Sequence, residues 1–186
     1  MKRFLKFQLL LAVVLLFGGA AMAQEKTGMV GGAAMYPSKN IIENAVNSKD
    51  HTTLVAAVKA AGLVETLEGD GPFTVFAPTN EAFAKLPAGA VDNLLKPENK
   101  AQLTAVLTYH VIPSMIDSKM LMDMIKKNSG TYTAKTVQGS ELKFMMKGKD
   151  LIVTDENGGM AKVTIKDVYQ KNGVIHVINA VLMPKM

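Results

Sequence analysis

The period of the hydrophobic pattern changes along this chain, and that change limits the possible folds more than any other feature. Early segments repeat apolar residues every three to four positions, as residues 52–61 do, which predicts amphipathic helices. In the last third, apolar and polar residues alternate, and the Asn-Gly pair at 157–158 predicts a hairpin turn. One earlier segment, residues 73–77, is apolar on both faces and predicts a buried strand. Helices followed by strands, without a βαβ repeat, predict an α+β fold with a mostly antiparallel sheet.

Three helices and their ends can be predicted in more detail. Ser38 is expected to cap the first helix of the domain. A second helix is expected over residues 52–61, with Gly62 as a left-handed C-cap. A longer helix is expected to begin at Pro97. In that helix His110 falls on the same stripe as three aliphatic residues, so its ring is expected to point inward.

The first 23 residues have the organisation of a secretory signal peptide. Three positive charges precede an uncharged run from residue 9 to residue 21, and Ala21-Met22-Ala23 forms a small-residue cleavage site. The apolar stretch is short for a membrane span and is diluted by Gly18 and Gly19. We therefore expect export to the periplasm or the cell surface, with no stable transmembrane anchor.

Residues 24–36 are rich in glycine and alanine without periodicity, so a flexible tether is expected there, followed by one domain over residues 37–186. The leader carries three of the 21 lysines and arginines and none of the 16 acidic residues, so the remainder has a net charge of only +2. Arg3 is the only arginine and the lysines are scattered. A nucleic-acid partner is therefore not expected. The chain has no cysteine, which excludes thiol catalysis and thiolate metal sites. We also expect the protein to be a monomer.

Three motifs in order resemble the signatures of the fasciclin (FAS1) family. They are Gly-Pro-Phe-Thr-Val-Phe-Ala-Pro-Thr-Asn-Glu-Ala-Phe at 71–83, Leu-Thr-Tyr-His-Val at 107–111, and Asn-Gly-Val-Ile-His-Val-Ile-Asn-Ala-Val-Leu-Met-Pro at 172–184. Asn179 stands where the family usually has Asp, so a carboxylate is missing there. The resemblance implies structural roles for the signature residues Phe76, Pro78, Thr79, Asn80, Phe83, Asn172, Gly173, His176, Asn179 and Pro184.

What the resemblance implies for fold is a twisted, mostly antiparallel β-sandwich or wedge with a helical layer along one side. For function it implies a non-enzymatic adhesion or binding module that contacts a cell-surface or matrix component, whether protein, polysaccharide or lipid. In animal relatives the pair that matches Tyr109-His110 contributes to adhesion. In the same animal relatives an Asp-Ile pair has been tied to integrin binding, and Asp167-Val168 stands at the matching position here. Since only the Asp matches, Asp167 is expected to be a turn or sheet-edge residue.

No enzyme is predicted from the residues themselves. The chain has no nucleophile elbow and no glycine-rich phosphate loop after a strand. The three histidines have no metal-ligand spacing, and no cofactor is expected. His110 is expected to be a core histidine that hydrogen-bonds the backbone, His176 to be structural, and His51 to face solvent.

Methionine is unusually frequent, with 13 in the chain, and Met120, Met122 and Met124 follow one another closely. Thioethers are soft ligands that suit Cu(I), so carriage of Cu(I) by these residues, or of a small apolar ligand, is the alternative function. Methionine is also a flexible filler of apolar cores. On a regular helix Met122 would point about 200° away from Met120, which argues against a shared metal site.

Overall fold

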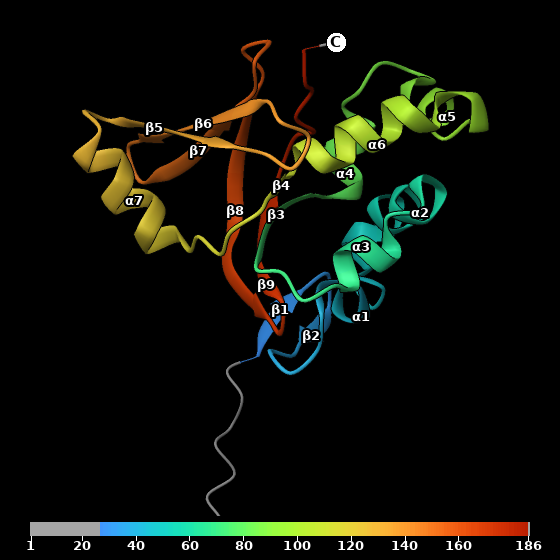
Figure 1. Ribbon diagram of the computed structural model, residues 1–186, viewed down its shortest axis with the longest axis horizontal. Coiled ribbons are helices and arrows are strands. Elements are labelled where there is room, and N and C mark those ends of the chain that lie inside the picture. The colour runs from blue at the N-terminus through green and yellow to red at the C-terminus, as the bar shows by residue number, and fades with distance from the viewer. Residues whose placement is uncertain (1–26, 186) are drawn as a thin grey trace, which may run out of the picture.

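The computed structural model describes residues 27–185 (Figure 1). The predicted signal peptide lies outside this range. The strands of the described part are β1 (Gly28–Val30), β2 (Ala33–Met35), β3 (Phe73–Pro78), β4 (Val111–Ile112), β5 (Thr131–Lys135), β6 (Glu141–Lys147), β7 (Asp150–Thr154), β8 (Met160–Gln170) and β9 (Gly173–Ile178). The helices are α1 (Ile41–Ala45), η1 (Lys49–His51), α2 (Thr52–Ala61), α3 (Val64–Glu68), α4 (Asn80–Ala84), α5 (Ala90–Leu94), η2 (Pro97–Asn99), α6 (Lys100–Tyr109) and α7 (Ser118–Lys127).

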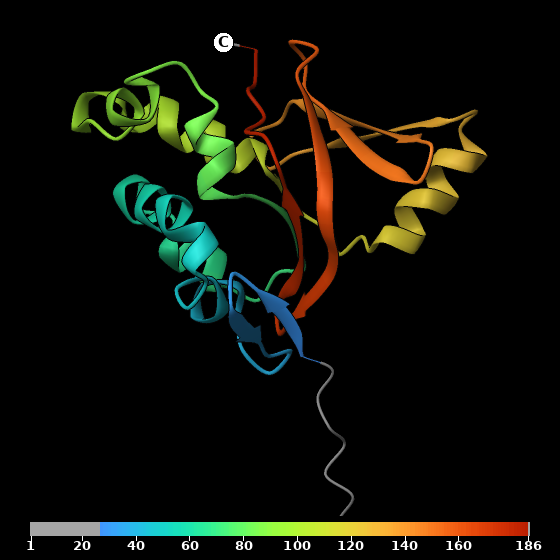
Figure 2. The same cartoon turned by 180° about the vertical axis from the view of Figure 1, so that it is seen from behind.

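Seven strands form one twisted sheet in the order β4-β3-β9-β8-β7-β6-β5. Every neighbouring pair is antiparallel except β3 and β9, the second and third strands in this order, which run parallel. Figures 1 and 2 show α1 to α6 on one side of the central strands, with α7 and the β5–β7 ribbon on the other. The predicted α+β fold with a mostly antiparallel sheet and a helical layer is confirmed.

The central strands separate two hydrophobic cores. Successive residues of a strand point to opposite faces of a sheet, and in β3 Val75 joins one core while Phe76 joins the other. The helical core contains residues of α1 to α6 with β1 and β2. The second core lies between α7, through Leu121 and Ile125, and the strands β5 to β8. The continuous apolar character of β3 is explained by this burial on both faces.

The predicted flexible tether is wrong for much of its length. Residues 28–35 form an antiparallel hairpin of β1 and β2, with Val30 paired to Ala33. Val30 and Met35 are buried in the helical core. The run of glycine and alanine hid this hairpin, because each strand has three residues and shows no periodicity.

Two predicted helix starts are displaced. The N-cap of α1 is Asn40, not Ser38: the Asn40 Oδ1 accepts a hydrogen bond from the Glu43 backbone at 2.9 Å, and the Glu43 Oε2 accepts one from the Asn40 backbone at 2.7 Å. This reciprocal pair is a capping box. Pro97 begins the short η2, and α6 follows from Lys100. The predicted α2 and its left-handed C-cap at Gly62 are confirmed.

Candidate functional site

His110 is a satisfied core histidine, as its position on the α6 stripe predicted. Its Nε2 accepts a hydrogen bond from the Leu182 backbone N–H at 3.0 Å, so its Nδ1 carries the proton and donates to the Val106 carbonyl at 2.8 Å. Burial lowers the pKa of His110 to about 4, against the opposing effect of the Val106 carbonyl. The ring is therefore neutral at pH 7 and ties the C-terminal segment to α6.

Tyr109 is fully buried beside it, on the side of the second core. Its hydroxyl donates to the Glu141 carbonyl at 2.8 Å and accepts a hydrogen bond from the Glu156 backbone N–H at 3.1 Å. Burial raises the pKa of the Tyr109 hydroxyl to about 12. The hypothesis that the Tyr109 and His110 side chains touch a partner is wrong for this fold, because both are inside the protein.

Asp167 connects β8 to the start of α7. It lies within an irregular stretch of β8, where the register to β9 shifts, and it has a positive φ of 60°, a conformation that Asp tolerates better than most residues. Its Oδ1 accepts a hydrogen bond from the Ser118 backbone N–H at 2.6 Å, and its Oδ2 accepts one from the Ser118 hydroxyl. Asp167 was expected in a turn or at a sheet edge, but it lies within β8, where its carboxylate binds the start of α7.

His176 lies in the middle of β9 next to this junction. The Asp167 backbone N–H donates to its Nδ1 at 3.3 Å, so Nε2 donates to the Ile116 carbonyl at 3.0 Å. The ring stacks on Phe76 with centroids 5.5 Å apart. Burial lowers the pKa of His176. Its predicted structural role agrees with these contacts.

His51 was expected to face solvent, and that expectation is wrong. Only 4% of His51 is exposed, and its Nδ1 lies 2.8 Å from the Ser48 hydroxyl. Its Nε2 faces the Ala77 carbonyl, which acts to raise the pKa, but the two atoms do not reach hydrogen-bond geometry. Burial dominates and lowers the pKa of His51. The β1–β2 hairpin and Ser48, which cover this position, could not be inferred from local sequence.

The motif at 172–184 begins at a junction of three elements. The Asn172 side chain accepts a hydrogen bond from the Ile41 backbone at 3.1 Å and donates to the Leu67 and Gly69 carbonyls at 2.7 and 2.8 Å. Gly173 then passes so close to β3 that a Cβ there would lie 2.1 Å from the Phe73 carbonyl oxygen. Asn172 therefore joins α1 and α3 to the sheet, and Gly173 permits the parallel pairing.

The motif at 71–83 provides β3 and two helix caps. Thr79 Oγ1 accepts a hydrogen bond from the Ala82 backbone at 3.2 Å and caps α4. Asn80 Oδ1 accepts one from the Thr53 backbone at 3.0 Å, and its Nδ2 donates to the Lys49 carbonyl at 2.8 Å. The remaining members of this motif, Phe76, Pro78 and Phe83, are buried.

Asn179 uses its amide where the signature usually has Asp. Its side-chain Oδ1 accepts a hydrogen bond from the Lys162 backbone N–H at 2.8 Å, and the backbone N–H of Asn179 donates to the Lys162 carbonyl at 3.2 Å. An amide oxygen serves this bond as a carboxylate oxygen would. Pro184, which ends the motif, is buried, and its carbonyl accepts a hydrogen bond from Asn157 at 3.4 Å.

The family model described as the fasciclin domain matches residues 49–184, which include all three motifs. This chain belongs to the fasciclin family. The β1–β2 hairpin and α1 lie before the matched segment.

Similar proteins support this assignment. Protein sll1483 of Synechocystis sp. is 46% identical over 162 residues, which cover 87% of this chain and 83% of that protein. Transforming growth factor-beta-induced protein ig-h3 of Sus scrofa is 39% identical over 131 residues, 70% of this chain but 17% of that protein. The FAS1 domain pair of the insect cell adhesion molecule fasciclin I has a TM-score of 0.71 at 18% identity, over 80% of this chain and 52% of that one. This structural likeness shows the FAS1 fold.

The three methionines of the copper hypothesis do not converge in this fasciclin domain. Met120, Met122 and Met124 all lie on α7, which is a helix from Ser118 to Lys127. Consecutive residues of a helix are rotated by about 100°, so Met122 points away from Met120 and Met124. Across the described residues, no group of three His, Asp or Glu side chains is placed to hold a metal ion either.

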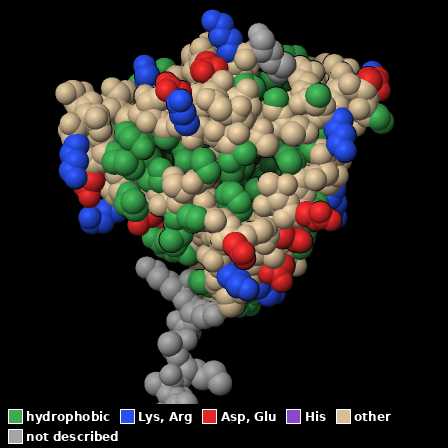
Figure 3. Space-filling view, in the orientation of Figure 1, with side chains coloured by type: hydrophobic (Ala, Val, Ile, Leu, Met, Phe, Trp, Pro, Cys, Tyr) green, Lys and Arg blue, Asp and Glu red, His purple; other side chains and the backbone are tan. Residues whose placement is uncertain are grey.

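An exposed apolar patch surrounds the start of α7. It consists of Met115, Met120 and Tyr169, which are 47%, 48% and 40% exposed, and we call it the methionine–tyrosine patch. Asp117 joins its parts: its Oδ1 accepts a hydrogen bond from the Met120 backbone at 2.8 Å, and its Oδ2 one from the Tyr169 hydroxyl at 3.4 Å. Figure 3 shows hydrophobic side chains gathered over α7 and the segment that leads into it. Sequence reasoning missed Tyr169 because the patch forms only when β8 meets α7.

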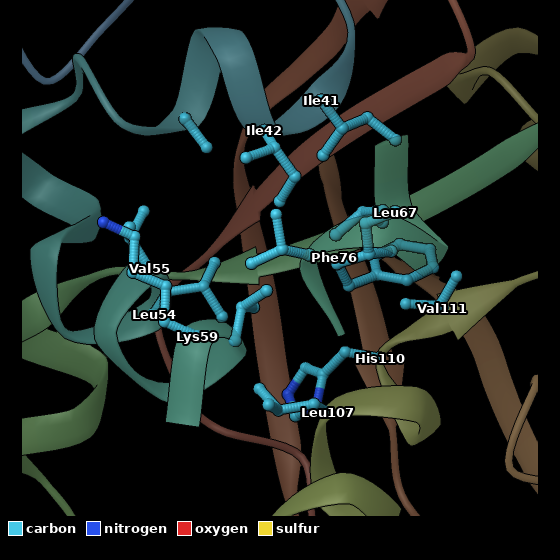
Figure 4. A pocket seen from close by; sticks show the side chains of 14 residues that line it. Ile41, Ile42, Leu54, Val55, Lys59, Leu67, Phe76, Leu107, His110 and Val111 are labelled. Carbon is cyan, nitrogen blue, oxygen red and sulfur yellow. The ribbon is translucent and has the colours of Figure 1, made fainter. Parts of the chain in front are cut away.

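A small apolar cavity lies between the helices and the sheet. Aliphatic side chains of α1, α2, α3 and α6 face one another there, with the His110 ring at one end (Figure 4). Lys59 is the single lysine among the residues that line this cavity. The cavity has a volume of about 40 Å³, whereas ligand sites commonly have about 300–1,000 Å³. It gives no support to the carriage of a small apolar ligand. No helix of the described part is long and apolar enough to cross a membrane.

Proposed function

We propose that this protein is an exported, non-enzymatic fasciclin module that binds a cell-surface component through the methionine–tyrosine patch. The observation that carries the proposal is the exposure of three large apolar side chains around one helix start. Single exposed apolar residues are common on soluble proteins, but a contiguous group is typical of an interaction site. The solved relative named as a cell adhesion molecule supports the same class of function.

The non-enzymatic part of the proposal rests on the histidines. Those residues are the only side chains with an unperturbed pKa near neutrality in this cysteine-free chain. His110 and His176 use both ring nitrogens for backbone groups, and the His51 ring is buried beside Ser48. A general base must reach a substrate proton, and none of these rings does so.

The patch is held firmly enough to act as a preformed contact. Asp117 and Asp167 both bind the first turn of α7, through Met120 and Ser118 respectively. Binding to such a site needs little ordering of the protein, which limits the entropic cost of association. Methionine also adapts its shape to different partners. The family relatives, the fixed helix start and the apolar chemistry together support contact with a surface rather than turnover.

The test is binding of the purified, fluorescently labelled protein to the surface fraction of its own host. The patch variant carries Met115→Gln and Met120→Gln. The matched control carries Met29→Gln and Met160→Gln, which are 61% and 59% exposed and lie outside the patch. We expect the patch variant to bind at least about fivefold more weakly, the loss of a typical interface contact, and the control to bind as the parent does. Equal binding by all three proteins would contradict the role of the patch.

A further inference from the structure

Strands β5 to β8 present one face to the second core and leave the other outside. Their inward residues are Ala134, Leu142, Phe144, Leu151, Val153, Ala161 and Val163. Because side chains alternate along a strand, the residues between them lie on the opposite side of the sheet, which we call the outer face. It is separated from α7, and so from the methionine–tyrosine patch, by the whole second core.

The outer face is rich in lysine. Four lysines lie on it, namely Lys135, Lys143, Lys147 and Lys162, and all are exposed. Only two carboxylates, Glu141 and Asp150, lie among them. Asp150 is occupied by Lys162, with Nζ 2.8 Å from Oδ2, whereas the other three lysines make no ion pair with any described residue.

The lobe built around the second core, residues 117–166, differs in charge from the helical lobe, residues 36–110. Residues 117–166 contain nine lysines and six acidic residues, whereas residues 36–110 contain six lysines and eight acidic residues. Figure 3 shows Lys side chains along the upper and left edges of the lobe that contains α7 and β5–β7. A surface of one sign attracts an oppositely charged partner and guides its approach. The net charge of residues 117–166 therefore favours an anionic partner over a cationic one.

The spacing of the lysines suits an extended polyanion. Lys143 and Lys147 are four residues apart on β6, which corresponds to about 13 Å. Lys135 pairs with Glu141 on the neighbouring strand, so it lies diagonally about 7–8 Å from Lys143. These three lysines follow the direction of β6. A chain with repeated negative charges could meet them in succession.

An exposed hydroxyl on the same face suits a carbohydrate. Thr133 pairs with Lys143 from one side and Thr154 pairs with it from the other. The Thr154 hydroxyl has no hydrogen-bond partner among the described residues, but it is buried and therefore out of reach of a ligand. A hydroxyl both donates and accepts hydrogen bonds, so the exposed Thr133 can bind the hydroxyl groups of sugars beside Lys143.

Other anionic partners fit less well. Recognition of single-stranded nucleic acid relies on aromatic platforms for base stacking, and the aromatic rings of this region, Tyr132 and Phe144, stack on each other away from the outer face. Docking on a bilayer requires large apolar side chains that enter it. On the outer face only Met160 is a large exposed apolar residue.

We propose that the outer face binds an acidic polysaccharide, an extended carbohydrate carrying carboxylate or sulfate groups, through Lys135, Lys143 and Lys147. This contact is distinct from the methionine–tyrosine patch. A molecule with both contacts holds an acidic polymer on one side of the lobe and a second surface component on the other. The protein then acts as a bridge between two materials.

The test measures binding of the purified protein to alginate, a carboxylated polysaccharide, with neutral dextran as the comparison. The face variant carries Lys135→Gln, Lys143→Gln and Lys147→Gln. The control variant carries Lys59→Gln, Lys96→Gln and Lys100→Gln, which removes the same charge from exposed lysines of the helical lobe. An exposed ion pair contributes about two- to fivefold in affinity. We therefore expect the face variant to bind alginate about tenfold or more weakly, and the control within about twofold of the parent.

Binding of the parent protein should fall steeply between low and high ionic strength, since exposed charges are screened within about 10 Å at 0.1 M salt. No binding to alginate, or equal losses in both triple variants, would overturn the proposal. Binding to phosphatidylglycerol vesicles without binding to alginate would overturn it in favour of a lipid surface. The Met115→Gln, Met120→Gln protein should keep its alginate affinity, which separates this contact from the proposed function.

Discussion

The Asp167 carboxylate receives both hydrogen-bond donors of Ser118, its backbone N–H and its hydroxyl. These two residues connect the centre of the sheet to the first turn of α7. Through that turn they also set the position of Met120 and therefore of the methionine–tyrosine patch. Asp167 matches the Asp that the resemblance linked to a contact in animal relatives. In this protein both of its carboxylate oxygens already accept hydrogen bonds from Ser118 of α7.

Replacing Asp167 with Ala is expected to lower the free energy of unfolding by about 2–4 kcal/mol. Both Ser118 donors lose their acceptor, and alanine is strained at a positive φ. Asp167→Asn is the matched variant, because asparagine tolerates this backbone conformation and keeps one acceptor. It should cost about 1 kcal/mol. Urea unfolding of the three proteins measures the difference, and equal stabilities of the Ala and Asn variants would contradict the role given to the two hydrogen bonds.

Gly173→Ala is expected to be among the most damaging single substitutions. The added Cβ would meet the Phe73 carbonyl oxygen at 2.1 Å, in the backbone of the parallel pair of β3 and β9. Because backbone atoms cannot move aside as a flexible side chain does, we expect a loss of more than about 3 kcal/mol. Gly148→Ala is the control: it has a positive φ but open space around it, so it should cost only about 1–2 kcal/mol. Soluble yield and chemical unfolding of both variants test this order.

Acidification is expected to destabilise the fold between about pH 6.5 and pH 4. The pKa of His110 is lowered to about 4 in the folded protein, whereas an unfolded histidine titrates near 6.5. The unfolded chain therefore binds more protons in this interval, and its population rises as the pH falls. His51 and His176 have lowered pKa values as well and act in the same direction. For His110 alone the loss at pH 4 is about 3 kcal/mol.

The measurement is the free energy of unfolding at pH 7.5 and at pH 4.5. A His110→Gln variant should be less stable at pH 7.5 but lose less stability on acidification than the parent. The same pH dependence in both proteins would contradict a neutral, buried His110.

The hairpin before α1 is expected to contribute to stability. Met35 is buried in the helical core, so Met35→Ala should lower the free energy of unfolding by about 2–5 kcal/mol. Met29 lies on the same hairpin and is mostly exposed, so Met29→Ala should change stability by less than about 0.5 kcal/mol. Thermal unfolding of the two variants distinguishes a packed hairpin from a flexible tether, for which both substitutions would be neutral.

Local patterns predicted the elements whose burial follows a simple period. The stripe in α2 and its end at Gly62 were predicted because apolar spacing and a left-handed cap are local properties. The inward position of His110 followed from the same reasoning. The signature motifs added the family and the α+β fold, which composition alone could not have specified.

Features that depend on distant segments could not be predicted in this way. His51 lies at a helix start, and only the folded hairpin and Ser48 make it buried. The parallel pairing of β3 with β9 joins Phe73 to Gly173, and no local pattern encodes such a partner. The candidate contacts share this property, since Tyr169 reaches Asp117 across 52 positions of sequence.

The place of β9 has a consequence for how this chain can acquire its structure. Gly173–Ile178 lies between β3 and β8 and supplies residues to both cores, so neither core can close until this late segment has emerged. Contacts over such a separation slow folding, because a long loop must be ordered first. We therefore expect a chain that still lacks this segment to leave both cores incomplete. We accordingly expect the complete fold to form late in synthesis, after β9 is present.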